Sequence, residues 1–62
     1  MSRFSVYLAA AHGAEAVRMI AWSLEQMRAG YPVVAGFAAT IAKRNAKSAA
    51  HAAIGAIREG RA

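Results

Sequence analysis

Apolar residues recur along residues 3–29 with the spacing of an α-helix. Intervals that alternate between four and three residues place a set of side chains along one side of a helix. Seven residues follow these intervals without interruption: Val6, Ala10, Gly13, Val17, Ile20, Leu24 and Met27. The sequence therefore predicts a helix over about 3–29, with these residues as its seam against another helix. A break at His12 and Gly13 is the main alternative, because glycine costs up to ~1 kcal/mol against alanine within a helix.

The second half of the chain shows the same spacing in a row of alanines. The seven positions are Ala35, Ala39, Ala42, Ala46, Ala49, Ala53 and Ala56. Alanine has the highest helix propensity, so the segment 33–58 is predicted to be helical even where packing is thin. A row of methyl groups also allows two helix axes to approach to the short end of the usual range of about 8–10 Å.

One strong interruption, "RAGYPVV" at residues 28–34, separates the two segments. Gly30 suits the position after a helix where a positive φ is required. Pro32 lacks a backbone N–H and fits the first turn of a new helix. Arg28 adds a cation at the negative end of the first helix dipole. We therefore expect one helix to end near Ala29 and the next to begin near Pro32.

The two predicted helices form an all-α, antiparallel hairpin, with residues 1–62 as a single small domain. In this interpretation the large residues of the first helix pack on the alanine stripe of the second. One long bent helix within an assembly also fits the periodicity. A chain of 62 residues without cysteine has little core and no disulfide, so packing with other chains is the expected source of stability.

Several large apolar residues lie off both predicted seams. They are Phe4, Tyr7, Leu8, Met19, Trp22, Val33, Phe37 and Ile41. A helix that is apolar on two sides is normally buried on two sides. The alternative is that the wrong seam was assigned and that some of these residues form the core. The pattern predicts a partner-binding surface for copies of the chain or for a larger protein assembly.

Basic residues gather on the second helix, and the chain carries a formal net charge of +5. Five of them share a sector of about 100° on a helical projection, away from the alanines: Lys43, Arg44, Lys47, His51 and Arg58. This sector is either a solvated face that keeps an alanine-rich helix dissolved or a contact for anions. Phosphate backbones and acidic lipids are the expected anions, since both bind positive charge without a sequence code.

Residues for catalysis or cofactor binding are scarce. The three acids, Glu15, Glu25 and Glu59, include no closely spaced pair for general acid–base work. His12 and Glu15 lie one turn apart, but a structural metal site normally needs four ligands. We therefore expect no enzyme activity, no small-molecule substrate, no metal and no cofactor. The longest apolar run, 31–42, is shorter than the ~20 residues that a membrane-spanning helix needs.

These features predict a non-enzymatic structural subunit, a small alanine-rich protomer of a particle, filament, virion or multisubunit complex. In composition the chain resembles the helical coat subunits of filamentous phages, whose basic ends face DNA. It lacks their acidic N-terminal segment and their long apolar centre, and no family is assigned. Alternatives are a cationic membrane-active peptide, similar to leaderless or circular bacteriocins, and a basic nucleic-acid-binding hairpin. The sequence leaves the compartment undetermined.

Overall fold

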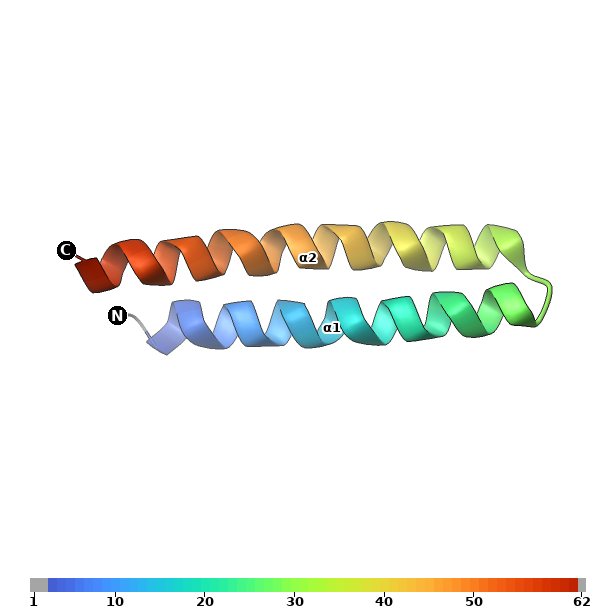
Figure 1. Ribbon diagram of the computed structural model, residues 1–62, viewed down its shortest axis with the longest axis horizontal. Coiled ribbons are helices and arrows are strands. Elements are labelled where there is room, and N and C mark those ends of the chain that lie inside the picture. The colour runs from blue at the N-terminus through green and yellow to red at the C-terminus, as the bar shows by residue number, and fades with distance from the viewer. Residues whose placement is uncertain (1–2, 62) are drawn as a thin grey trace.

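The computed structural model describes residues 3–61 and contains two helices in that range, α1 (Arg3–Arg28) and α2 (Pro32–Arg61). The helices run antiparallel as a straight rod of 49 × 13 × 11 Å, with both open ends on the same side (Figure 1). The predicted all-α hairpin is confirmed. The alternative break at His12 and Gly13 is wrong, because α1 continues through both residues, and α2 extends three residues beyond the expected end at 58.

The turn between the helices follows from Gly30. Its φ is +87°, a conformation that favours glycine. The Tyr31 N–H donates to the Gln26 carbonyl at 2.9 Å, and the Gly30 N–H donates to the Met27 carbonyl at 3.1 Å. This pair of bonds is a Schellman motif, which satisfies carbonyls that the helix end leaves open. The connection therefore reverses the chain within a few residues.

Helix α2 begins directly after this motif. Pro32 is its first residue, where the missing N–H costs no intrahelical hydrogen bond. The first bond of the new helix runs from the Ala35 N–H to the Tyr31 carbonyl at 3.0 Å. The sequence predictions for Gly30 and Pro32 are both confirmed.

Alanine dominates the contact between the helices. The buried residues in the described part of the chain are all alanines: Ala16, Ala35, Ala38, Ala42 and Ala56. On α1, we call the row that faces α2 the inner face: Ser5, Ala9, His12, Ala16, Met19, Ser23 and Gln26, all buried or half-buried. Its counterpart on α2 is Ala35, Ala38, Ala42, Asn45, Ala49, Ala52 and Ala56. Small side chains let the two helices pack closely along their whole length.

This packing corrects the seam predicted for α1. Each predicted residue directly follows an inner-face residue, so the predicted row is rotated by about 100° from the real one. Val17 and Ile20 are 67% and 51% exposed, and only Gly13 of the seven is half-buried. The physical reason is size, because Ser5, Ala9 and Ala16 allow a closer approach of the helix axes than Val, Ile or Leu would.

On α2 the predicted alanine stripe is partly correct. Ala35, Ala42, Ala49 and Ala56 do face α1. At the alternate positions, however, Ala38, Asn45 and Ala52 take the places predicted for Ala39, Ala46 and Ala53. Ala39 and Ala46 are exposed, and Ala53 is half-buried. Sequence reasoning missed Asn45 and the polar members of α1, although small and polar residues there also follow the four–three spacing.

Candidate functional site

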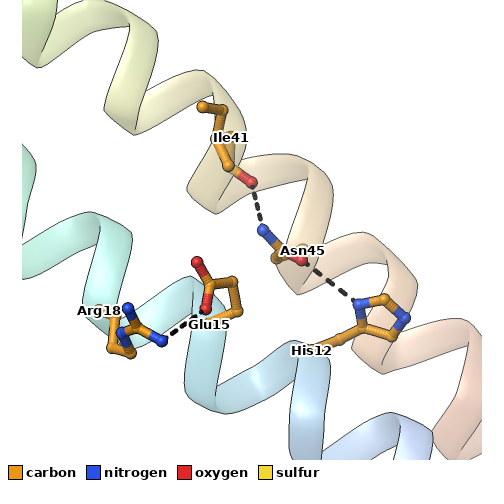
Figure 2. Close-up of polar contacts among 5 residues, drawn as sticks. All are labelled: His12, Glu15, Arg18, Ile41 and Asn45. Carbon is orange, nitrogen blue, oxygen red and sulfur yellow. Dashed lines mark hydrogen bonds and ion pairs between the residues drawn. The ribbon is translucent and has the colours of Figure 1, made fainter.

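Polar side chains meet near the middle of the hairpin. His12 Nδ1 lies 3.3 Å from Asn45 Oδ1, across the contact between the helices (Figure 2). The tautomer with a proton on Nδ1 donates a hydrogen bond to this oxygen. Asn45 also donates from Nδ2 to the Ile41 carbonyl at 3.1 Å, one turn earlier on its own helix. The Asn45 amide is thus held at both ends, and it links α1 to α2 at one register.

Two more polar contacts lie toward the ends of the rod. Near the turn, the Ser23 hydroxyl donates to the Ala35 carbonyl at 2.7 Å. At the open end, the Ser5 hydroxyl donates to the Glu59 carboxylate at 3.2 Å. Hydrogen bonds fix a register more sharply than methyl contacts do, because they depend on direction as well as distance. Together with His12 and Asn45, these contacts align the two helices along the rod.

The large apolar side chains lie on the outside of the hairpin. Sixteen in the described part of the chain are exposed: Phe4, Val6, Tyr7, Leu8, Val17, Ile20, Trp22, Leu24, Met27, Tyr31, Val33, Val34, Phe37, Ile41, Ile54 and Ile57. Single exposed apolar residues are normal, but continuous rows of them mark interaction surfaces. The usual arrangement of a small domain, with large residues inside and small ones outside, is reversed here.

One such row runs along the side of α1. We call it the outer stripe, and it consists of the residues predicted as the α1 seam: Val6, Ala10, Gly13, Val17, Ile20, Leu24 and Met27. It borders an open groove. Ile20 and Leu24 line this groove from α1, and Ala39, Lys43 and Ala46 line it from α2. The structure therefore brings residues of both predicted seams to one side of the hairpin, where they face outward instead of each other.

The opposite side of α1 is apolar with charged interruptions. Phe4, Leu8 and Trp22 each directly precede an inner-face residue, which places them on this side. Glu15 and Arg18 occupy the same row and form an ion pair at 3.1 Å (Figure 2). We call Phe4, Leu8, Trp22, Phe37 and Ile41 the aromatic face; all five are exposed.

Three residues predicted to belong with the partner-binding set lie elsewhere. Met19 belongs to the inner face and is half-buried against α2, which corrects its predicted place. Tyr7 and Val33 are exposed, at 69% and 70%. Projected along their helices, both point away from the contact between α1 and α2. They therefore lie at the outer edges of the rod.

Most of the basic sector of α2 lies on the side away from α1, but Lys43 also lines the groove beside Ile20 and Leu24. Its members Lys43, Arg44, Lys47, His51 and Arg58 are all exposed. The one ion pair found between described residues joins Glu15 and Arg18 of α1, so these five are paired with no carboxylate in that range. A row of exposed basic residues attracts phosphate groups or acidic surfaces.

Among residues 3–61, no group of three or more His, Asp or Glu side chains could hold a metal ion. His12 of the inner face contacts Asn45, whereas His51 lies in the basic sector of α2. Over the same residues, neither helix has an apolar stretch long enough to cross a membrane.

Comparisons of the chain with protein-family models, with curated proteins and with solved structures find no match.

Proposed function

We propose that this chain is a non-enzymatic assembly subunit, a small helical rod that packs through its apolar sides with copies of itself in a larger particle or complex. One observation carries the proposal: large apolar residues lie outside, and alanines fill the contact between the helices. Burial of a large apolar side chain contributes about 1.5–3 kcal/mol, and most of that stabilisation is unused in a single hairpin. Association with other chains supplies the missing burial.

The two apolar sides of α1 extend this proposal beyond a simple pair. The outer stripe and the aromatic face lie on opposite sides of the hairpin, so contacts through one leave the other available. A rod with two separate adhesive sides joins more than one neighbour, which is what a filament or a shell requires. The length of the rod, 49 Å, gives each contact several helical turns.

The test is the absolute mass of the purified chain in detergent-free buffer, measured by light scattering after gel filtration at low and at high salt. The expected result is a discrete species of two or more chains at both salts, because apolar contacts are not screened by ions. Far-ultraviolet circular dichroism on the same fractions reports helicity. A fully helical monomer at both salts would contradict the proposal.

A second candidate function rests on the basic sector. Lys43, Arg44, Lys47 and Arg58 are all exposed. Arg44, Lys47 and Arg58 project away from α1, whereas Lys43 lies at the groove beside Ile20 and Leu24. Association through α1 therefore leaves at least three of the four fully available to a phosphate backbone. The measurement is binding of a short mixed-sequence DNA duplex during a salt titration. If all four cations contact phosphate, the logarithm of the affinity falls with that of the salt concentration with a slope of about −3.6.

The test variant is the double replacement Lys43→Ala and Lys47→Ala, which removes two of these charges; the α1 arginines serve as the matched control. It should reduce the slope by about 1.8, whereas replacing Arg3 and Arg28 of α1 with alanine should leave the slope unchanged. A salt-independent affinity would exclude phosphate contact. Dye leakage from anionic vesicles, without DNA binding, would instead favour the membrane-active alternative.

A further inference from the structure

We infer that the outer stripe of α1 is a self-association interface, through which two copies of the chain pair their α1 helices antiparallel with Val17 near the two-fold axis. The inference rests on the proposed function and adds the partner, the surface and the orientation. Its occupant is a second copy of this chain, for the reasons of charge, area and side-chain size given below.

The two flanks of α1 differ in charge. The outer stripe holds seven residues, from Val6 to Met27, and none of them is charged. The opposite row contains Glu15, Arg18 and Glu25. Charged residues are depleted at the centre of protein interfaces, because their desolvation is unfavourable. The outer stripe is therefore the flank of α1 that is better suited to burial, with Lys43 of α2 as the charged residue that lines the groove beside it.

The accessible area of the single hairpin fits one additional interface. Its surface is 4696 Å², for a chain of 6.5 kDa. The scaling of surface with mass gives about 3,800 Å² for a compact monomer of this size. The excess of about 900 Å² is close to the ~800 Å² that each partner buries in an interface of standard size. One self-contact along a flank of the rod brings the exposed area to the ordinary range.

The sizes of the side chains in the outer stripe favour the antiparallel orientation. The half near the open end is small, with Ala10 and Gly13, and the half near the turn is large, with Ile20, Leu24 and Met27. Antiparallel pairing centred on Val17 lays the small half of one copy against the large half of the other. Parallel pairing would place the large halves together and leave a gap between the small ones, at the cost of packing density.

The distribution of charge favours α1 over α2 at the centre of the pair. Helix α1 carries three arginines and two glutamates, a net charge of +1. Helix α2 carries five Lys and Arg residues and one glutamate, a net charge of +4. Pairing through α1 keeps the two basic helices on the outside, where their mutual repulsion is weakest. Arg44, Lys47, His51 and Arg58 then remain exposed in both copies, and Lys43 lies beside the interface.

Disulfide trapping tests this arrangement, because the chain has no native cysteine. Under mild oxidation, Val17→Cys should form a covalent dimer in most of the chains on a non-reducing gel. Residues at the two-fold axis approach within the ~7 Å between Cα atoms that a disulfide allows. Ala11→Cys, on the opposite flank of α1, is the control and should give at least tenfold less dimer.

A second pair of variants tests the orientation. In the antiparallel pair, the two copies of residue 10 lie about 20 Å apart along the helices, so Ala10→Cys alone should not cross-link. An equimolar mixture of Ala10→Cys and Leu24→Cys should cross-link, because these residues lie opposite each other. Efficient cross-linking of Ala10→Cys alone would indicate parallel helices and overturn the inference.

The outcomes separate this inference from the proposed function. Cross-linking at Ala11→Cys but not at Val17→Cys, in a sample whose mass exceeds one chain, would overturn the outer stripe as the interface and leave the assembly function standing. Cross-linking at neither residue in such a sample would also overturn the inference. A helical monomer by light scattering would remove both.

Discussion

The inner face and the outer stripe of α1 are neighbouring rows of the same helix, offset by a single residue throughout. The inner face is built from alanine, serine, histidine and glutamine, with Met19 as its only large apolar member. The outer stripe is built mainly from valine, isoleucine, leucine and methionine. The row with the weaker hydrophobic signal is the one that packs within the chain. Side-chain size decides this choice, because α2 presents methyl groups that reward close approach.

The difference in composition separates two sources of stability. The inner face holds the hairpin closed through many small contacts and a few directed hydrogen bonds. The outer stripe exposes most of its apolar area to solvent, where another surface could cover it. The proposed self-association would make the stability of the fold depend on chain concentration, because a partner that binds only the folded state stabilises it. Four predictions test the contrast between the two rows.

The largest effect is expected when a charge enters the outer stripe. Val17→Glu leaves the hairpin intact, since Val17 is exposed in the single chain. At the proposed interface, however, it buries an unpaired carboxylate, which costs about 3–5 kcal/mol. The self-association constant should fall at least 100-fold, as measured by sedimentation equilibrium. Ala14→Glu adds the same charge to an exposed position of α1 outside both rows and should change the constant less than threefold.

A smaller effect is expected from enlarging a residue of α2 that packs on the inner face. Ala38 is 0% exposed, so Ala38→Leu forces the helices apart and should lower the free energy of unfolding by about 1–3 kcal/mol. Ala50→Leu makes the same change at an exposed position of α2 and should stay within about 0.5 kcal/mol. Urea denaturation followed by circular dichroism measures both variants. Equal losses would show that close packing of the helices does not stabilise the hairpin.

The turn and the helices could be predicted from sequence because their signals are local. Gly30 and Pro32 each favour one backbone conformation, and the alanines favour helix whatever they contact. The seam of α1 could not be assigned in this way. A four–three spacing of large residues indicates that a helix packs along that row, but it does not identify which helix packs there. Val17 and Ile20 carry the same signal whether their partner is α2 or another chain.

On α2, the alanine-rich composition leaves it ambiguous which row of residues faces α1. Positions 38 and 39 are both alanine, and so are positions 52 and 53. The row that contains Ala38 and Ala52 and the row that contains Ala39 and Ala53 therefore fit the spacing equally well. The row that faces α1 is distinguished by Asn45, whose amide needs a partner away from bulk solvent, and His12 provides it. The exposed apolar residues were recognised from the sequence, but their division into an outer stripe and an aromatic face depends on which row of α1 meets α2.

An intermediate effect is expected for the polar pair inside the hairpin. A double-mutant cycle with His12→Ala and Asn45→Ala should give a coupling of about 1 kcal/mol, because each change leaves a half-buried partner without its hydrogen bond. The cycle with Glu15→Ala and Arg18→Ala, an exposed ion pair, should give about 0.3 kcal/mol. Urea midpoints supply all of these values. A larger coupling for Glu15 and Arg18 than for His12 and Asn45 would show that the hydrogen bond inside the hairpin stabilises it less than an exposed ion pair does.

The smallest effect is expected for a single hydroxyl. Ser23→Ala removes the 2.7 Å bond to the Ala35 carbonyl, which is worth about 1 kcal/mol, but it gains part of that back through helix propensity. Ser48→Ala, at an exposed position of α2, gains helix propensity without losing a hydrogen bond to the other helix. The two variants should therefore differ by about 1 kcal/mol in unfolding free energy, with Ser48→Ala the more stable. Identical thermal melts would show that the Ser23 bond contributes nothing.

The turn at Gly30 also sets the order in which the rod forms. Ser23 and Ala35 meet across 12 positions of sequence, whereas Ser5 and Glu59 meet across 54. The entropy lost on closing a loop rises with the logarithm of its length, so starting at the open end costs about 1.3 kcal/mol more than starting at the turn. Folding therefore proceeds as a zipper from Gly30 toward the termini. In the folded rod, hydrogen exchange should be slowest beside the turn and fastest at the open end.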